Sequence, residues 1–500
     1  MYFRDSFIVA SKSEDVQFFF GKKLDFLQET GIMKKTINNG GVSMKLNYKR
    51  TILVGLAFLS ISAFWQMYDG VVPLILTNNF QLNETWSGAI MAADNILALF
   101  LLPLFGSLSD KVNTRIGRRM PFILCGTAAA VILVNVLPYL ANGFYVTHSQ
   151  SLLLAFVVVL GLLLISMGTY RSPAVALMPD VTPKPLRSKG NAVINLMGAL
   201  GGIIYLGITA ELYSNERIAA HYTIGTIAGV DGQPVAVVNY TVLFAVVSLI
   251  MVAAVVVLFV TIKEKKLSEE NQAYEKAHPE QNLAEKSDDG SEELPKAVKR
   301  SLLFVLCSIS LWYIGYNGVT TWFSTYISRV MGEGIGGASR CLLVATGGAI
   351  LSYIPVGMVA SKVGRKKTIL FGVALLATCF GLAYLMTVNA TAITWPMYIL
   401  FACVGIAWAS INVNSLPMVV EMCKGSDIGK FTGYYYTFSM AAQVITPIVA
   451  GTLLRNVGYQ TLFPYAAFFV ACSFVTMLMV KHGDVKVERK SGLEAFDVED

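Results

Sequence analysis

The chain has 500 residues, of which 55% are hydrophobic and only 14% are charged. Because a soluble globular domain carries roughly a quarter of its residues as charged ones, this composition excludes an ordinary soluble protein. A net charge of +7 suggests a nucleic-acid partner in a soluble protein. In a chain this apolar, we expect instead a lipid bilayer as the partner and no nucleic acid.

Twelve stretches of the chain are apolar over the ~20 residues that an α-helix needs to cross a bilayer. They lie near residues 50–77, 86–108, 121–141, 150–177, 189–212, 238–262, 301–328, 338–360, 367–388, 394–420, 430–454 and 460–481. The predicted fold class is therefore an all-α membrane protein with twelve transmembrane helices. An even number of spans puts both termini on the same side.

Basic residues are concentrated in alternate short loops, beside residues 49–50, 111–119, 184–189 and 362–367. The opposite loops, near 78–85, 142–149 and 389–393, contain no Lys or Arg. By the positive-inside rule, the basic loops and both termini are cytoplasmic. We expect a multi-pass protein of the plasma membrane.

A long polar stretch from Lys263 to Arg300 separates spans six and seven, and its Glu, Asp, Ser and Gln residues predict a solvated cytoplasmic linker. We therefore divide the chain into five parts: an N-terminal extension at 1–48, an N-terminal six-helix half at 49–262, the linker at 263–300, a C-terminal six-helix half at 301–482 and a cytoplasmic tail at 483–500. We expect the extension to be disordered or to precede the native start, at Met33 or Met44.

The two halves carry similar motifs at matching positions. After span two, G-x-x-x-D-K at 106–111 precedes G-R-R at 117–119; after span eight, G-x-x-x-S-K at 357–362 precedes G-R-K-K at 364–367. Parallel six-helix repeats of this kind are typical of major facilitator transporters, whose substrate site lies between the halves near the membrane midplane. The pattern thus predicts two pseudo-symmetric halves in a major facilitator fold.

The run from Pro103 to Phe122 resembles the P-x-x-G-x-x-S-D…R-x-G-R-R-x-P-F string of sucrose:proton symporters and their relatives. Those proteins form part of the glycoside, pentoside and hexuronide cation symporter group and the related solute carrier family 45. The segment from Arg171 to Asp180 is also similar to the group's fourth span and the loop after it. The resemblance covers spans one to five well and the second half loosely, and it implies sugar transport coupled to a cation.

Asp69, Asp94 and Arg171 are ionisable residues inside predicted spans. A charge at that depth costs at least ~2.5 kcal/mol, so such residues usually face a partner or a watery path. Asp94 is our first candidate for proton coupling, and Asp69 is the second. Sodium-coupled members of the resembled group carry a second acid one turn later, where this chain has Ala98, so we expect a proton rather than sodium and no other cofactor. The alternative for Asp94 is a structural carboxylate hydrogen-bonded across helices.

The first half offers several side chains suited to a sugar, which is bound by flat aromatic faces and by polar groups on its hydroxyls. The candidates are Trp65, Tyr68, Asp69, Asn95 and Arg171. We expect Arg171 to pair with Asp69 or Asp94 in one state and with a sugar hydroxyl in another. The alternatives are that Trp65 and Tyr68 anchor their helix at the interface and that Arg171 snorkels to the headgroups.

The second half contains amides and aromatic residues but no acid deep in a span, which predicts solute contacts rather than charge chemistry. The candidates are Trp312, Tyr316, Asn317, Asn412 and Asn414. Asn191, Asn195 and Gln443 are weaker candidates, because a lone amide in a span is more often an interhelical hydrogen-bond partner.

Charged and glycine residues at the cytoplasmic ends of the helices suit a gate, because an ion-pair cluster that forms in one conformation and breaks in another biases the equilibrium between them. The gate candidates are Gly106, Asp110, Gly117, Arg118, Arg119, Asp180, Arg365 and Glu421. We expect Asp110 to pair with Arg118 or Arg119. The alternative is that the positive charges only fix topology.

Several chemistries have no motif here. The chain has no Walker loop, no H-E-x-x-H and no G-x-S-x-G, and neither its four histidines nor its seven cysteines are clustered, so we expect neither an enzyme nor a metal site. We predict a monomeric proton-coupled importer of a neutral sugar, a glucoside or a disaccharide such as sucrose or maltose. The alternatives are a drug or metabolite:proton antiporter and a non-transporting sugar receptor.

Overall fold

The computed structural model describes residues 36–38, 41–43, 46–229, 232, 234–277, 295–388, 390, 392–422 and 428–484. Within that part, 12 helices are long and apolar enough to cross a membrane, which confirms the predicted number and the all-α class. The spanning helices are α2 (Tyr48–Leu74, extended by a π-helical turn at Ile75–Asn79), α3 (Glu84–Lys111), α4 (Met120–Thr147), α5 (Gln150–Val181), α6 (Arg187–Leu212), α8 (Thr241–Thr261), α10 (Lys296–Met331), α11 (Ile335–Val363), α12 (Arg365–Thr387), α13 (Trp395–Val420), α14 (Ile428–Asn456) and α15 (Leu462–Leu478).

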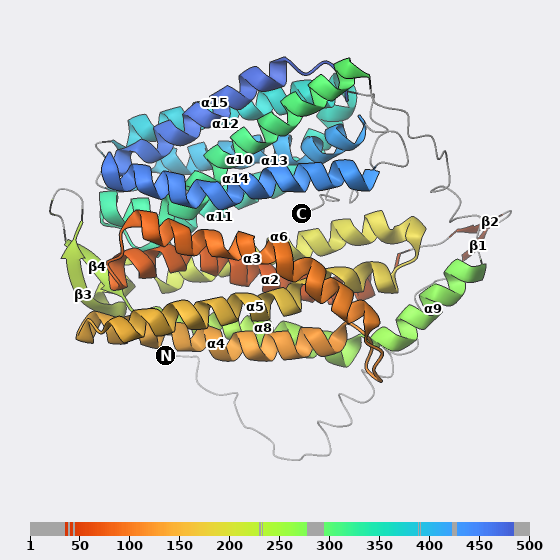
Figure 1. Cartoon of the computed structure of the whole chain (residues 1–500), viewed down its shortest axis with the longest axis horizontal. Coiled ribbons are helices and arrows are strands. Elements are labelled where there is room, and N and C mark those ends of the chain that lie inside the picture. Colours follow the sequence, from red (N-terminus) through yellow and green to blue (C-terminus); the bar gives the residue numbers. More distant parts are fainter. Residues whose placement is uncertain are drawn as a thin grey trace, which may run out of the picture.

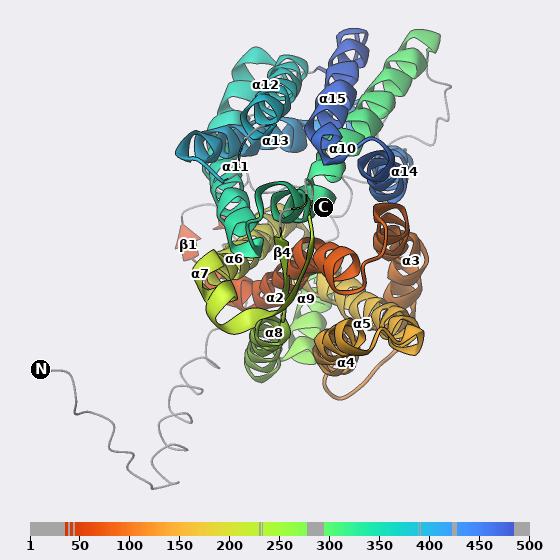
Figure 2. The same cartoon turned by 90° about the vertical axis from the view of Figure 1, so that its left-hand side faces the viewer.

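The spanning helices form two bundles of six, which lie side by side in both views (Figures 1 and 2). One bundle contains α2 to α6 and α8, and the other contains α10 to α15. Each bundle is centred on its own cluster of buried apolar side chains. The bundles contact each other chiefly along three helix pairs, α3 with α14, α6 with α11 and α2 with α10, with a smaller contact between α2 and α11. The molecule therefore has two separately packed halves with a seam between them, as the repeated motifs predict.

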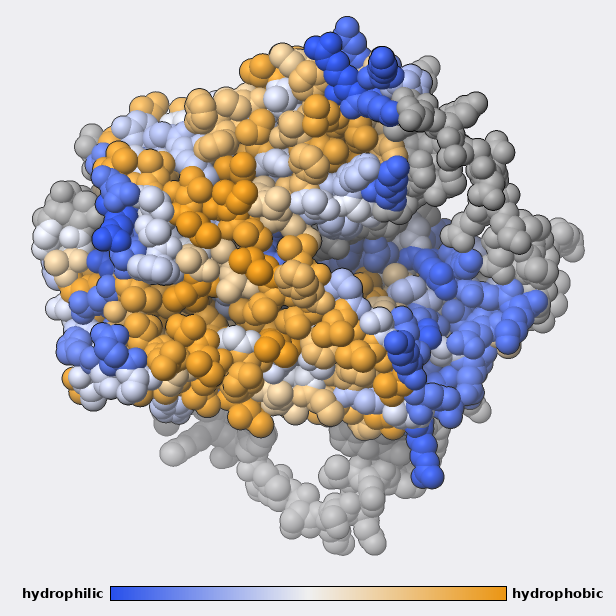
Figure 3. All heavy atoms as spheres, viewed as in Figure 1, coloured by the Kyte–Doolittle hydropathy of each residue, from blue (hydrophilic) through white to orange (hydrophobic). Residues whose placement is uncertain are grey.

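The outer surface of both bundles is apolar, because these helices face lipid rather than water. Large side chains such as Phe100, Ile132 and Leu351 are exposed there. Figure 3 shows the resulting hydrophobic band, with hydrophilic residues gathered toward its two ends. This distribution is the reverse of the pattern in a soluble bundle, and it fits helices that cross a membrane.

Two short hairpins were not predicted from the sequence. The larger one pairs β3 (Thr223–Ala228) with β4 (Pro234–Val238) in an antiparallel register between α6 and α8, after the short helix α7 (Asn215–Arg217) and a π-helical turn at Ile218–Tyr222. It covers one end of the molecule, which we call the hairpin end (Figure 1). The smaller hairpin pairs β1 (Thr36–Asn38) with β2 (Gly41–Ser43) inside the expected N-terminal extension, most of which lies outside the described residues.

The opposite end carries the basic loops, and we call it the basic end. The segment expected to be a solvated linker begins there with a helix, α9 (Glu264–Ala277). This helix packs against α5 and the start of α6: the Asn271 side-chain amide donates to the Asp180 carbonyl (3.1 Å), and Arg187 pairs with Glu275 (2.8 Å). The linker thus starts as a docked helix, and residues 278–294 lie outside the described part.

Candidate functional site

A cavity of about 790 Å³ lies between the two halves. Its wall includes Asp94 and Asn95 on α3 and continues to Arg187, the first residue of α6, at the basic end. The space-filling view shows the hollow between the halves on the side of α9 (Figure 3). The cavity is therefore reached from the basic end.

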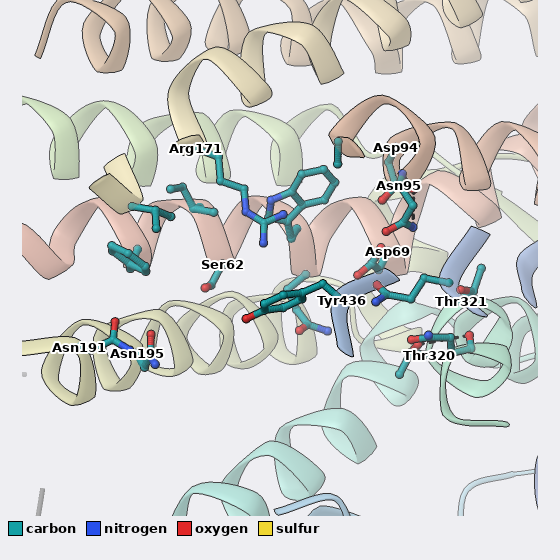
Figure 4. Close-up of a pocket in the computed structure, with 18 of the residues that line it drawn as sticks. Ser62, Asp69, Asp94, Asn95, Arg171, Asn191, Asn195, Thr320, Thr321 and Tyr436 are labelled. Carbon is teal, nitrogen blue, oxygen red and sulfur yellow. Dashed lines mark hydrogen bonds between the residues drawn. The ribbon is translucent and has the colours of Figure 1, made fainter. Parts of the chain in front are cut away.

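Three helices of the N-terminal half bring its predicted site residues to this cavity. Trp65 and Asp69 lie on α2, Asp94 and Asn95 on α3, and Arg171 on α5, and all five line the cavity. In Figure 4, the carboxylates of Asp69 and Asp94 face the same space, into which Arg171 also extends. Ionisable groups more than a hundred residues apart in sequence thus share one water-accessible space between helices.

The guanidinium of Arg171 makes a different contact from the one expected. Its central carbon lies 5.8 Å from the centroid of the Trp65 ring, a cation–π distance. Among the described residues, no ion pair joins Arg171 to Asp69 or Asp94. Asp94 instead accepts hydrogen bonds at Oδ1 from the Asn95 backbone (2.5 Å) and side chain (2.8 Å). The predicted acid–Arg171 pair is absent from this conformation, because the indole face and the neighbouring amide satisfy the two charges separately.

The rest of the cavity wall combines neutral polar side chains with apolar ones. The amides Asn191, Asn195 and Gln443, which were weaker candidates, all line it, as does the stronger candidate Asn317. Further polar lining residues that we had not singled out are Ser62, Gln66, Thr320, Thr321 and Tyr436. The polar part of this lining supplies many hydrogen-bond donors and acceptors around Asp69, Asp94 and Arg171. Such a lining suits a neutral polyhydroxy solute.

A second cavity of about 430 Å³ lies between α2 and α6 of one half and α10, α11 and α13 of the other. Two predicted site residues, Tyr316 and Asn412, line it. Trp408, one helical turn before Asn412, was missed by the sequence analysis. Its ring stacks on Tyr316 with centroids 3.7 Å apart and planes 6° from parallel. A tryptophan in an otherwise apolar span, four residues before an asparagine, was the signal available in the sequence.

Three predicted binding residues lie away from both cavities. Tyr68 and Trp312 are fully buried in the apolar clusters of their halves. Asn414 is 3% exposed and donates to the Ser410 carbonyl at 2.9 Å. Neighbouring positions on a helix point about 100° apart, so Tyr68 turns into the bundle where Asp69 turns to the cavity. These residues pack helices in this conformation.

The gate candidates of the N-terminal half gather at its basic end. Arg118 binds Asp180 through two nitrogens, at 3.0 and 2.5 Å, and Arg119 binds the same carboxylate at 2.8 Å. Arg119 also pairs with Asp110 and donates to the Gly106 carbonyl at 3.3 Å. Burial lowers the pKa of Arg118, but the hydrogen bonds and the charge of Asp180 outweigh this effect, and the pKa is raised from its usual value.

The C-terminal half repeats this arrangement. Arg365 pairs with Glu421 at 2.6 Å, as Arg118 does with Asp180. Gly117 and Gly364, which precede these arginines, both have a positive φ (121° and 100°) that a side chain would strain. The repeated motif therefore builds the same turn and the same ion pair in each half.

Glu264, which the sequence analysis did not single out, lies against the gate candidates Arg118 and Arg119. It is 1% exposed, and its carboxylate accepts from the backbone N–H groups of Arg118, Arg119 and Met120, each at 2.8 Å. These N–H groups lie at the start of α4 and have no partner within the helix. The helix dipole favours a negative charge at this position. Asp484 occupies a similar place before α12, with the Lys366 backbone N–H at 3.3 Å. The signal was an acid just beyond the last span of each half.

The hairpin end is closed by contacts between the two halves. Arg329, on α10, donates to the carbonyls of Thr77 (2.7 Å) and Ala228 (3.0 Å), both in the N-terminal half. Nearby, Tyr459 donates to the Glu84 carboxylate at 2.5 Å. These contacts shut the end opposite the cavity mouth.

Helices α3 and α14 meet closely at the same end. A Cβ atom at Gly88 would lie 2.1 Å from the carbonyl oxygen of Pro447, too near for any side chain. Glycine is therefore required at this crossing while the hairpin end is closed.

Two six-helix bundles, a polar cavity between them and one closed end define a membrane transporter. The comparison with protein families identifies the kind: the chain belongs to the Major Facilitator Superfamily, whose model matches residues 54–352 and 338–497. Solved structures share the fold at low sequence identity. A nucleoside transporter aligns with a TM-score of 0.60 at 13% identity, over 87% of this chain and 100% of that one. A bacterial homologue of human drug peptide transporters aligns with a TM-score of 0.58 at 11% identity, over 87% and 98%.

Among curated proteins, the matches are partial. A sucrose transport protein of Arabidopsis thaliana is 29% identical over 135 residues, which cover 25% of this chain and 23% of that protein. An MFS transporter of Aspergillus fumigatus is 30% identical over 173 residues, covering 34% and 30%. A general alpha-glucoside permease of Schizosaccharomyces pombe is 32% identical over 77 residues, covering 15% and 14%. The matched segments thus span less than a third of each relative.

Proposed function

We propose that this protein imports a neutral sugar, a glucoside or a disaccharide such as sucrose or maltose, together with one or more protons by alternating access. The observation that carries the proposal is the central cavity, where the carboxylic acids of Asp69 and Asp94 and the guanidinium of Arg171 share a wall with amides, hydroxyls and aromatic rings. Charge chemistry and neutral-solute recognition then take place in one compartment.

The orientation follows from the distribution of charge. With the basic end on the cytoplasmic side, the positive-inside rule is satisfied, both termini are cytoplasmic and the cavity opens inward. In this reading the structure is the inward-facing state, and the hairpin end is the closed outer gate. We place the protein in the plasma membrane as a monomer.

The proton role is given to Asp94, with Asp69 as the second titrating group. Both are carboxylic acids in a low-dielectric setting that opens to water on one side, which suits a group that binds a proton from one compartment and releases it to another. A sodium site would need several oxygens around the ion. Ala98 stands one turn after Asp94, where sodium-coupled members of the resembled group carry a second acid, so we propose a proton rather than sodium.

Arg171 links protonation to solute binding in this proposal. It is near enough to Asp94 to interact with its charge, yet it lies against Trp65 rather than in an ion pair. A deprotonated Asp94 attracts the guanidinium, whereas a protonated one leaves it available for sugar hydroxyls. Competition between the acid and the solute for Arg171 would couple their binding.

The sugar class is supported by two kinds of observation. The cavity lining is rich in amides and hydroxyls, and partial relatives bear the names of sucrose transport proteins and a general alpha-glucoside permease.

The test is uptake of radiolabelled sugars into proteoliposomes under an imposed pH gradient. We expect the unsubstituted protein to accumulate a disaccharide above its outside concentration. Asp94→Asn should abolish accumulation while sugar exchange remains measurable, because only the proton site is lost. Glu216→Gln is the matched control, since it removes the same charge from an exposed position at the hairpin end. Full concentrative uptake by Asp94→Asn would refute the assignment.

A drug or metabolite:proton antiporter is the second candidate, because the partial match to an MFS transporter of Aspergillus fumigatus specifies neither a solute nor a direction of coupling. The same vesicles separate it from a symporter: an antiporter moves its solute against the direction of proton flow. Binding of sugar with no flux in either direction would instead indicate the sugar receptor.

A further inference from the structure

The second cavity adjoins the first and opens a compartment beside it. Six polar side chains line both cavities: Ser62, Gln66, Asp69, Asn195, Asn317 and Thr320. A solute in the central cavity therefore meets the same polar groups that border the second one. A volume of about 430 Å³ is within the range of pockets that hold small ligands.

One wall of the second cavity is a supported aromatic surface. Tyr316 and Trp408 stack on each other, and the Tyr313 ring meets Trp408 edge-on at 5.5 Å and 89°. The hydroxyl of Tyr313 lies 3.4 Å from that of Tyr435, which is in turn 3.1 Å from Ser415. Tyr316 and Trp408 are half-buried, so part of their ring surface remains accessible. Each ring of this surface is thus supported by contacts with its neighbours.

The rest of the wall leaves room beside the rings. Small residues of three helices line it, namely Gly198, Ala199, Gly202, Ala345, Ala349 and Gly405. Asp69, at the border with the central cavity, is the sole Asp, Glu, Lys, Arg or His among the described lining residues. A flat aromatic face in a neutral pocket with polar groups at its mouth suits a sugar ring, which has an apolar C–H face and a polar rim.

We propose that the second cavity is a subsite for one ring of a two-ring sugar, whose other ring occupies the central cavity. The glycosidic linkage then passes the six shared polar side chains. This assignment rests on the proposed function and narrows it: the preferred solutes are disaccharides or glucosides with a second ring, and a single hexose ring leaves the Tyr316–Trp408 surface unused.

Gly202 offers a way to fill the subsite alone. A Cβ there would have the Gln66 side-chain oxygen as its nearest neighbour, at an ordinary 3.9 Å, so a larger side chain enters the cavity without striking backbone. Gly207 is the matched control, because it lies on the same helix, has no atom within 4 Å of its Cβ position and lines neither cavity.

The experiment compares uptake of a radiolabelled disaccharide with that of methyl α-glucoside, which has one ring. We expect Gly202→Val and Trp408→Ala to raise KM for the disaccharide about tenfold, the scale of a lost buried aromatic contact. The KM for methyl α-glucoside should change less than about twofold. Trp408→Phe should retain part of the disaccharide affinity, and Gly207→Val should match the unsubstituted protein.

The outcomes separate the two proposals. If the substitutions at Gly202 and Trp408 impair both sugars equally, or neither, the subsite is overturned while sugar transport stands. Unchanged uptake of methyl α-glucoside also shows that a variant is folded. If the unsubstituted protein carries no sugar at all, the proposed function is overturned and the subsite with it.

Discussion

The two ends of the molecule are held by different kinds of contact. At the hairpin end, Arg329 joins the two halves through backbone carbonyls of Thr77 and Ala228. At the basic end, the ion pairs Arg118–Asp180, Arg119–Asp110 and Arg365–Glu421 each lie within one half. The contacts between the halves must break if the halves rock against each other, whereas the ion pairs within each half can stay intact.

The ion pairs of the basic end are the gate candidates, and their role as a gate stays a prediction. The sequence analysis interpreted the charged cluster as a latch that forms in one conformation and breaks in another. In this conformation the cluster ties α3, α4 and α5 together inside one half, with Glu264 holding the start of α4. In the proposed alternating access, a half stiffened in this way would move as one body.

The largest effect should come from wedging the closed end. In Gly88→Val, the new side chain meets the Pro447 carbonyl and prevents α3 and α14 from closing, so we expect uptake to fall to background. An impermeant thiol reagent should then label a cysteine placed at Ser328, which is buried when the end is closed. The protein without the introduced cysteine gives the background labelling.

Gly161→Val is the control for this substitution, because the Cβ position of Gly161 has no neighbour within 4 Å. Normal uptake by Gly88→Val would show that close approach at this crossing is not needed for transport.

A smaller effect is expected from Arg329→Ala. Each hydrogen bond from a charged donor contributes ~1.5–3 kcal/mol, and water replaces part of it when the end opens. We expect the closed hairpin end to be disfavoured about tenfold, which corresponds to ~1.4 kcal/mol. The measurement is the rate of thiol labelling at Ser328→Cys.

Arg329→Lys sharpens the comparison. A lysine keeps the charge but lacks the planar guanidinium that reaches two carbonyls. The rate of thiol labelling in Arg329→Lys should therefore lie between the rates of the protein with Arg329 and of Arg329→Ala. Equal rates for all three proteins would mean that Arg329 does not hold the halves together.

The smallest effect on transport should come from the ion pair Arg365–Glu421. We expect Arg365→Met and Glu421→Gln each to lower the thermal stability of the purified protein. The double variant should lose less stability than the two single variants lose together, with a coupling free energy of ~0.5–3 kcal/mol between the two positions. The labelling rate at Ser328→Cys should not change, because both residues belong to one half. A strong change in that rate would make the pair part of the gate.

Local sequence determined much of this protein. The twelve spans follow from stretches of apolar residues, and the two halves follow from repeated motifs that place Arg118 and Arg365 beside Asp180 and Glu421. Residue type also identified Asp69, Asp94 and Arg171 as occupants of a polar cavity, because an ionisable group in a span needs water or a partner. Such inferences need only the length, periodicity and chemistry of single segments.

Tertiary structure alone decided the rest. It placed Arg171 against Trp65 rather than an acid, turned Tyr68 into a helix bundle and stacked Trp408 on Tyr316, a residue 92 positions earlier in the chain. It also decided which end is closed. These outcomes depend on the angles and separations at which helices pack, and packing is the sum of many weak contacts between distant segments, which no single stretch of sequence contains.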